Sequence, residues 1–180
     1  ANTDNRVQPG CRFVAKVLAY EGGAGEWLRD VWCFGEYLWD DPWWGPVWGG
    51  TSMDELIHGS QAAGITTLGF SSFPFFRVQT LYDRDYGETG AWSANEALAV
   101  LNGGPHIVNH LGHSYNLAHL RLVISQVDRL SNQQPFMIYS QGCHAGAFDN
   151  RAPADSEGFV YDRDCIGEHY LLAEHGAGAA

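Results

Sequence analysis

Residues 105–149 read PHIVNHLGHSYNLAHLRLVISQVDRLSNQQPFMIYSQGCHAGAFD, and this stretch decides the fold. It contains two short apolar runs, Ile107–Leu111 and Phe136–Tyr139. Each run is followed by a glycine and then by a reactive side chain, His113 in the first case and Cys143 in the second. Such runs are typical of buried parallel strands. Because the active crevice of an open α/β sheet lies past the carboxyl ends of its strands, the pattern predicts a histidine base beside a cysteine thiol.

The rest of the chain alternates between strand and helix signals. We expect strands at residues 28–34 and 75–82, and helices at residues 11–21, from Met53 onward, at 94–101, at 124–130 and at 165–174. Residues 150–164 are expected to form a polar loop. The capping-box patterns Ser52-x-x-Glu55 and Ser93-x-x-Glu96 predict two of the helix starts, and Asp164 is expected to cap the last helix. This alternation predicts an α/β fold with a mainly parallel sheet and helices on both faces.

Composition limits the possible functions. The 180 residues are 45% hydrophobic and 17% charged, as in a globular domain with a core of its own. The net charge of −11 argues against nucleic acid as a partner, because phosphates would be repelled. No apolar run is long enough to span a bilayer, and no signal peptide is recognisable. Of the four cysteines, Cys33 and Cys165 are interpreted as small buried hydrophobic residues.

The chain resembles the gingipain family of cysteine peptidases, which have a caspase-like fold. The resemblance rests on G-H-S at 112–114 and on P-F-M-I-Y-S-Q-G-C-H-A-G-A-F-D at 135–149. Supporting motifs are Tyr20-Glu21, Trp27 and Asn102-Gly103-Gly104. The resemblance implies a cysteine endopeptidase that acts on polypeptides outside the cell or at its surface, without a required cofactor. Residues 1–180 are then a single gingipain-like domain that we expect to be incomplete at one or both ends.

The catalytic roles follow from this pattern and this resemblance. Cys143 is the expected nucleophile and His113 the general acid and base. The small residues Gly142, Ala145 and Gly146 let a substrate approach the backbone. The backbone N–H of Cys143, with that of Gly112 or a neighbour, could form an oxyanion hole. By resemblance, Glu36 is the acidic residue near the catalytic histidine and would orient its ring. The alternative for Glu36 is a surface carboxylate at a strand end.

Substrate recognition is harder to assign. Family members that cut after arginine carry an acidic residue on the helix that follows the Trp-rich loop, and the nearest position here is Met53, with Asp54 beside it. Methionine cannot pair with a guanidinium, so specificity for arginine is in doubt unless Asp54 substitutes. We interpret His144 as a pocket-wall residue, and the aromatic loop 39–50 as a lid, a pocket wall or a loop docked on the core.

Acidic loops raise the possibility of calcium, which occurs in gingipain-like domains. Asp40-Asp41, Asp83 and Asp85 could supply oxygen ligands, although such carboxylates are more often solvated. At the chain end, Gly176–Ala180 is expected to enter the sheet, with a continuation or a partner chain covering it.

Two alternatives to a peptidase stay open. One is a catalytically inactive relative that serves as a surface or secretion-associated module. The other is a metal hydrolase that uses His110, His113 and His144. The H-x-x-H spacing on a strand places His110 and His113 on opposite sides, which disfavours a shared metal. His110 is instead interpreted as a strand-end residue packed under the catalytic loop.

Overall fold

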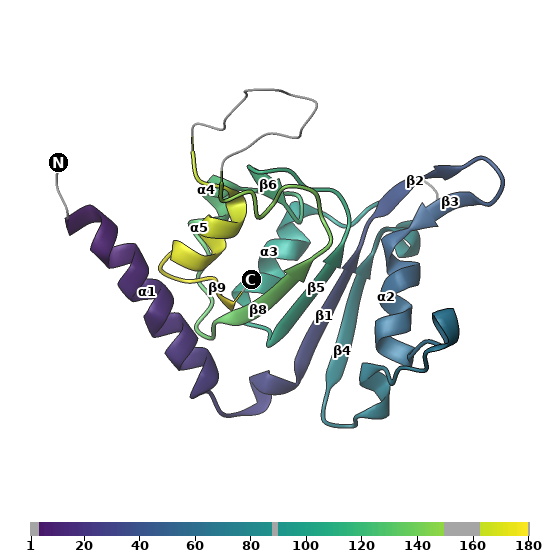
Figure 1. Cartoon of the computed structure of the whole chain (residues 1–180), viewed down its shortest axis with the longest axis horizontal. Helices are drawn as coiled ribbons and strands as arrows, with labels where there is room; N and C mark the ends of the chain where they lie inside the picture. The colour runs from purple at the N-terminus through teal and green to yellow at the C-terminus, as the bar shows by residue number, and fades with distance from the viewer. Residues whose placement is uncertain (1–3, 88–89, 150–162, 180) are drawn as a thin grey trace.

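The computed structural model describes residues 4–87, 90–149 and 163–179. At its centre is a five-stranded sheet in the order β4-β1-β5-β8-β9, in which every neighbouring pair is parallel (Figure 1). The strands are β1 (Asp30–Gly35), β4 (Arg77–Tyr82), β5 (Ile107–Leu111), β8 (Phe136–Ser140) and β9 (Ala177–Ala179). The α/β fold with a mainly parallel sheet is therefore confirmed.

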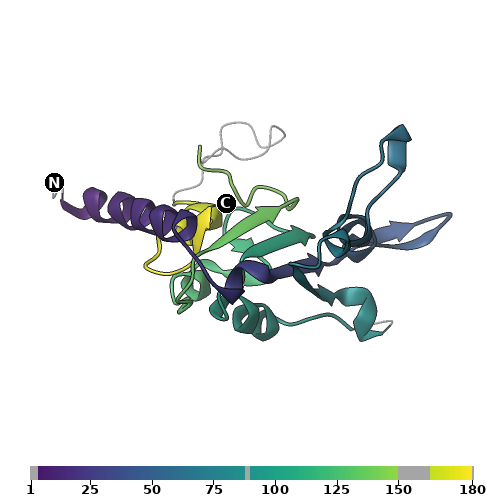
Figure 2. The ribbon, with the colours of Figure 1, turned by 90° about the horizontal axis from the view of Figure 1, so that it is seen from below.

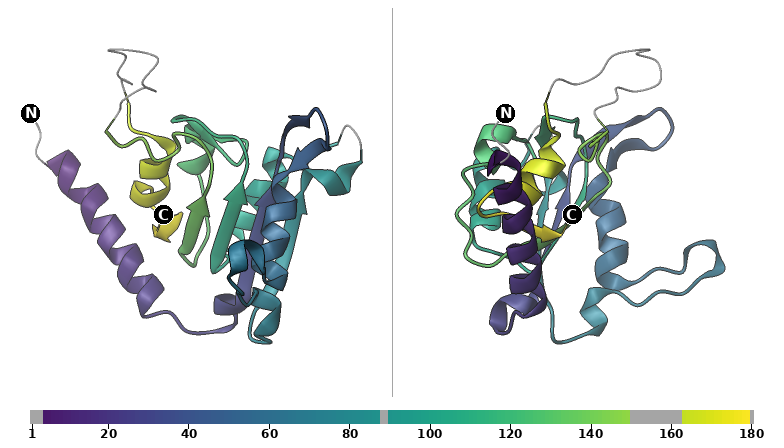
Figure 3. Two further views of the ribbon diagram at one scale, coloured as in Figure 1. Left: turned by 45° about the vertical axis from the view of Figure 1, so that its right-hand side comes forward. Right: turned by 60° about the vertical axis from the view of Figure 1, so that its left-hand side comes forward.

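Helices cover the two faces of the sheet, because successive strand residues point to opposite sides. On one face, Val31 and Cys33 of β1 pack with Met53 and Ile57 of α2 (Gly49–His58). On the other face, Phe34 of β1 belongs to a larger core. That core takes in residues of three further helices, α3 (Ala94–Asn102), α4 (Ile124–Val127) and α5 (Ile166–Leu172). The turned views show the helices on both sides of the sheet (Figures 2 and 3).

The N-terminal helix α1 (Asp4–Glu21) lies at the outer edge of the sheet beside β9 and α5 (Figure 3). The entry of the chain end into the sheet is confirmed, because Ala177–Ala179 pairs with β8. In the part of the chain that the structure describes, no helix has both the length and the apolar character that a membrane span requires.

The Trp-rich segment forms a hairpin instead of the expected loop. It consists of β2 (Tyr37–Asp41) and β3 (Gly45–Trp48), which pair antiparallel. The carboxylate of Asp41 accepts the backbone N–H groups of Trp43 and Trp44, which fixes the turn. Both tryptophans are exposed, at 88% and 87%. The hairpin projects from the body of the molecule (Figure 2).

Two of the three predicted helix caps are wrong. Helix α2 begins at Gly49 after Trp48, so Ser52 lies inside the helix and does not cap it. Helix α5 follows Cys165 and not Asp164, and the Glu168 carboxylate accepts the Cys165 N–H at 2.9 Å. The capping box at Ser93 and Glu96 is confirmed.

The remaining elements are short. They are the 3₁₀ helices Glu26–Arg29, Ala62–Gly64, Phe70–Ser72 and Asp83–Tyr86, and the two-residue strands β6 (Ala118–His119) and β7 (Leu122–Val123). Most of the polar loop expected at 150–164 lies outside the described residues.

Candidate active site

Three adjacent strands deliver the predicted catalytic residues to one edge of the sheet. β1, β5 and β8 are neighbours and run parallel, so their carboxyl ends meet. Glu36 directly follows β1, His113 follows β5 after Gly112, and Cys143 follows β8 after two intervening residues. The side chains of His113 and Cys143 are exposed, whereas Glu36 is buried. This edge of the sheet is therefore the candidate active site.

The two loops that carry His113 and Cys143 touch each other. The hydroxyl of Ser114, the residue after His113, donates to the Cys143 carbonyl at 2.6 Å. The His113 ring places Nε2 3.0 Å from the Tyr37 carbonyl. Because a carbonyl only accepts, Nε2 carries the hydrogen in this contact, and in the neutral ring the lone pair is on Nδ1.

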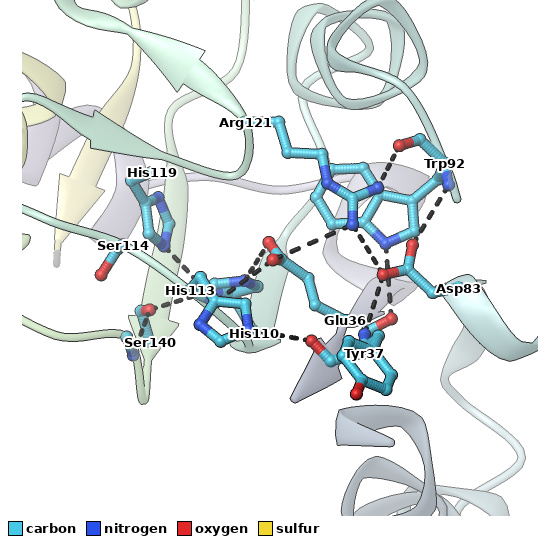
Figure 4. Close-up of polar contacts among 12 residues, drawn as sticks. Glu36, Tyr37, Asp83, Trp92, His110, His113, Ser114, His119, Arg121 and Ser140 are labelled. Atoms are coloured by element: carbon cyan, nitrogen blue, oxygen red, sulfur yellow. Dashed lines mark hydrogen bonds and ion pairs between the residues drawn. The ribbon is translucent and has the colours of Figure 1, made fainter. Parts of the chain in front are cut away.

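Glu36 binds the backbone of His113 and the ring of a different histidine (Figure 4). One carboxylate oxygen accepts the His113 N–H at 3.2 Å, and the other lies 3.1 Å from His110 Nε2. The guanidinium of Arg121 lies 3.9 Å from the same carboxylate. Glu36 thus fixes the His113 loop through its main chain, and the orienting contact with the ring that sequence analysis expected is taken by the carbonyl of Tyr37.

His110 is fully buried and is the centre of a polar network. Its Nδ1 lies 2.9 Å from the Ser140 hydroxyl and 3.1 Å from His119 Nε2. The His119 Nδ1 in turn lies 3.4 Å from the Tyr170 hydroxyl. Burial, and secondarily the nearby His110, holds the pKa of His119 well below its ordinary value, so this ring is neutral. Ser140 also accepts the N–H of Gly142 at 3.0 Å, next to Cys143.

A cleft of about 720 Å³ opens beside His113. The β2–β3 hairpin supplies Tyr37, Asp40 and Trp48 to its wall, as the pocket-wall interpretation of the aromatic segment predicted. Opposite them lies Arg121, which pairs with the buried Asp83 at 2.6 Å and stacks over the Trp92 ring at 4.0 Å. The cleft is thus aromatic and carries more acidic than basic side chains.

A comparison with known protein families identifies the family of this chain. The model of the family described as peptidase family C25 matches residues 8–180. The chain belongs to this family. This family is one of cysteine peptidases. Gingipains are among the solved structures that resemble the chain, so its fold is caspase-like.

Three solved structures show the shared fold. The Arg-specific cysteine proteinase gingipain R has a TM-score of 0.63 and 15% identity, with 92% of this chain matching 35% of that chain. A structure described only as a protease has a TM-score of 0.63 and 19% identity, over 95% of this chain and 33% of that one. The complex of the pro- and mature domains of RgpB from Porphyromonas gingivalis has a TM-score of 0.57 and 16% identity, over 93% and 35%. The chain therefore spans about a third of these proteins. No curated protein matches it.

The predicted specificity residues of this family member lie apart from the cleft. Met53 is fully buried in the core under α2. Asp54 pairs with Arg84 at 2.6 Å. His144 is exposed next to Cys143, in a left-handed backbone conformation with φ of 55°. Of the predicted substrate-binding residues, the structure thus places Gly112, Gly142 and His144 beside the catalytic loops and does not place Met53 or Asp54 there.

Two further cysteines are buried within the fold, and two of the loop aspartates lie close to arginine side chains. Cys33 and Cys165 are buried free thiols, as predicted, and burial raises the pKa of Cys33 to about 12. Asp83 binds Arg121, and Asp85 lies 3.8 Å from Arg84. Within residues 4–87, 90–149 and 163–179, no three His, Cys, Asp or Glu side chains gather as a metal site would require.

Sequence analysis missed the role of the network around His110. It interpreted this residue as a strand-end histidine packed under the catalytic loop, which fits its burial but not its contacts. A signal was present in the spacing, because His110 precedes His113 by three residues and Ser140 precedes Cys143 by three (113 − 110 = 143 − 140 = 3). Equal spacing on neighbouring parallel strands places His110 and Ser140 side by side, as their register shows.

Proposed function

We propose that this chain is the catalytic part of a cysteine endopeptidase, with Cys143 as the nucleophile and His113 as the general acid and base. The observation that supports the proposal is an exposed thiol and an exposed imidazole on two touching loops that follow adjacent parallel strands, in a chain of peptidase family C25. Such a pair has the parts that thiol-based acyl transfer needs.

In the proposed reaction, His113 accepts the proton of the Cys143 thiol, and the thiolate attacks the carbonyl carbon of the peptide bond. Backbone N–H groups near Gly112 and Cys143 stabilise the resulting oxyanion. The C–N bond then breaks, the amine leaves with the proton held by His113, and a thioester remains on Cys143. Water, deprotonated by His113, hydrolyses the thioester and returns the free thiol.

Glu36 serves this reaction indirectly in our proposal. Its carboxylate is 4% exposed and holds the His113 N–H at 3.2 Å, so it fixes where the loop presents the ring. Its negative charge also favours the imidazolium that forms during the reaction.

The substrate in this proposal is an extended polypeptide bound across the cleft. Tyr37 and Trp48 offer aromatic walls, and Asp40 favours basic side chains. Gly112, Gly142 and His144 would contact the main chain near the bond that is cut. Specificity for arginine is not carried over from gingipain R, because Met53 is buried and Asp54 is occupied by Arg84.

We further propose a location outside the cell or at its surface, by resemblance to the gingipains. A further segment or chain would complete the molecule, in line with a relative whose pro- and mature domains form a complex. The proposed reaction uses no calcium, since each of its steps is assigned to protein side chains, backbone N–H groups and water.

Replacing Cys143 by alanine tests the function. Profiling with a peptide library first identifies a cleaved substrate, and Cys143→Ala should then abolish turnover while leaving the unfolding midpoint in urea nearly unchanged, because the side chain is exposed. The control is Cys11→Ala, which removes the other exposed thiol and should keep full activity. Iodoacetamide should block the enzyme and a chelator should not. Full turnover by Cys143→Ala would refute the assignment, and inhibition by the chelator alone would favour a metal hydrolase.

A further inference from the structure

We propose that His110 is a positioning residue that sets the spacing between the His113 loop and the Cys143 loop. The inference rests on the proposed function, since it gives the buried network a role in that same site. His110 does not face the cleft and touches neither exposed catalytic side chain. It acts through two partners, Glu36 on one side and Ser140 on the other (Figure 4).

The first partner ties His110 to the His113 loop. A carboxylate accepts and cannot donate, so the 3.1 Å contact with Glu36 requires a hydrogen on His110 Nε2. The second oxygen of Glu36 accepts the His113 N–H at 3.2 Å. Both side chains are buried, and an interaction of this kind is stronger there than in water. The position of the His110 ring therefore fixes the carboxylate, and the carboxylate fixes the backbone of the loop.

The second partner ties His110 to the Cys143 loop. The Ser140 hydroxyl oxygen accepts the Gly142 N–H at 3.0 Å, which leaves its own hydrogen free to point at His110 Nδ1, 2.9 Å away. The parallel register places His110 and Ser140 directly opposite each other. The chain of contacts runs without a gap from the N–H of His113 to the N–H of Gly142.

The rest of the surroundings holds the ring in place. His119 stands perpendicular to it with ring centroids 4.7 Å apart, and Tyr170 backs His119 from α5. Because His119 stays neutral, it adds no positive charge beside the ring, and its Nε2–H shares the single Nδ1 lone pair of His110 with the Ser140 hydroxyl. The charged groups around the ring are thus Glu36 and, beyond it, Arg121 at 3.9 Å from the carboxylate.

Two glycines show how little room the network leaves. A Cβ added at Gly112 would lie 2.5 Å from His110 Nε2 and from the Glu36 carboxyl carbon. A Cβ added at Gly142 would collide with the Ser114 hydroxyl of the His113 loop and would lie 3.1 Å from the Ser140 hydroxyl of the network. The two loops are therefore packed against the network itself, and a change in the network must move them.

The test uses pairs of matched variants. His110→Phe keeps a ring but removes both nitrogens, and its control is His106→Phe, which makes the same change just before the other end of β5, where His106 packs on Tyr20 and Trp27. Ser140→Ala breaks only the link to the Cys143 loop, and its control is Ser125→Ala on α4. Each variant is assayed for kcat and KM on the peptide that the parent cleaves, and for amide hydrogen exchange.

We expect kcat to fall roughly 100-fold in His110→Phe and roughly 10-fold in Ser140→Ala, since small misplacements of reacting groups have effects of this size. KM should change little, because the cleft residues stay in place. Exchange should speed up at the His113 and Gly142 amides in His110→Phe, and at Gly142 alone in Ser140→Ala. The variant that combines His110→Phe with Ser140→Ala should lose as much kcat as His110→Phe alone, because both changes interrupt the same chain of contacts.

The outcomes separate this inference from the proposed function. If the parent cleaves peptides and both network variants keep its kcat and its amide exchange, His110 has no positioning role. If they lose activity without any change at the two amides, the inference is also refuted. A parent that cleaves no peptide and whose Cys143 resists alkylation refutes the proposed function; faster exchange at the two amides would then still support the structural coupling. Should His110→Phe fail to fold, Ser140→Ala alone decides.

Discussion

At the scale of single residues, the site depends on a glycine between the strand and the histidine. Gly112 is buried, and its backbone runs against the Glu36–His110 pair. The G-H motif was recognised in the sequence as a mark of catalysis, with the glycine interpreted as a possible N–H donor to an oxyanion hole. The contacts of Gly112 show a second reason for it, because any side chain would collide with the buried, hydrogen-bonded Glu36–His110 pair.

Gly112→Ala should therefore damage both stability and activity. The added methyl group must displace Glu36 or His110, and overpacking of this kind destabilises by about 1–3 kcal/mol. We expect a lower urea midpoint and at least a 10-fold loss of kcat, since general acid–base positioning is worth roughly 10²–10⁴-fold. Urea unfolding and steady-state kinetics on the purified variant measure these effects. Gly10→Ala is the control, because a Cβ there meets nothing within 4 Å. Unchanged stability and turnover in Gly112→Ala would contradict the crowding argument.

At this scale, sequence patterns located His113 and Cys143 but could not assign partners. Glu36, Ser140 and His119 meet His110 from three separate segments of the chain. A pattern of apolar runs predicts which strands exist, and their order in the sheet then decides which side chains meet. That order brings β1 and β5 together although they are separated by more than 70 residues, which no local signal contains.

At the scale of elements, two serines with the same local pattern behave differently. The Ser93 hydroxyl accepts the Glu96 N–H at 3.3 Å, and the Glu96 carboxylate accepts the Ser93 N–H at 2.8 Å. Ser52 has a glutamate three residues later as well, but it lies within α2. The pattern failed there because Gly49 packs closely against the Leu111 carbonyl at the end of β5, and Gly50 against Gly35 of β1 and the Tyr82 ring. These tertiary contacts start the helix earlier.

Alanine at the two serines should reveal this difference. Ser93→Ala removes a real cap and should lower the free energy of unfolding by about 1 kcal/mol. Ser52→Ala replaces an exposed residue inside a helix with the best helix former, so it should be neutral or slightly stabilising. Urea denaturation of both variants beside the parent measures the two values. Equal losses at both positions would show that Ser52 caps α2 in solution.

The sequence predicted secondary structure correctly where an element has a regular apolar pattern, and less well where that pattern is interrupted. The central strands were predicted within about two residues. The hairpin of residues 37–48 was interpreted as a loop, because its glycines and prolines mask the strand pattern and its tryptophans are not buried. Its pairing comes from the turn that Asp41 fixes.

At the scale of the whole molecule, the two ends of the chain support each other. Lys16 of α1 is buried and donates to the carbonyls of Tyr170 and Ala173 at 3.0 Å and of His175 at 3.2 Å. These carbonyls lie near the end of α5 and before β9, where helical hydrogen bonding has stopped. A single ammonium thus ties α1 to the segment that forms the outer strand of the sheet. Sequence analysis predicted the helix and the strand, but it had no means of pairing residues more than 150 positions apart.

This contact makes stability depend on pH in a defined window. Burial, and secondarily the charge of Arg12, lowers the pKa of Lys16 from its ordinary 10.5 to about 8. Between these two pH values the unfolded chain binds a proton that the folded chain has released. The free energy of unfolding contributed by this group therefore rises as pH increases from 8 to 10.5, and it is flat below pH 8.

Lys16→Met should remove that rise. It should also lower stability at pH 8 by about 1–3 kcal/mol, because three carbonyls lose their donor in a buried place. Urea unfolding of the parent and the variant at several pH values gives the difference between them, in which other titrating groups cancel. That difference should grow from pH 8 to 10.5. Arg12→Met is the control, since it removes an exposed charge from the same helix and should raise the pKa of Lys16, so that the rise begins at higher pH. A difference between parent and Lys16→Met that stays constant with pH would show that Lys16 keeps its ordinary pKa and that the ends of the chain are joined less tightly than these contacts indicate.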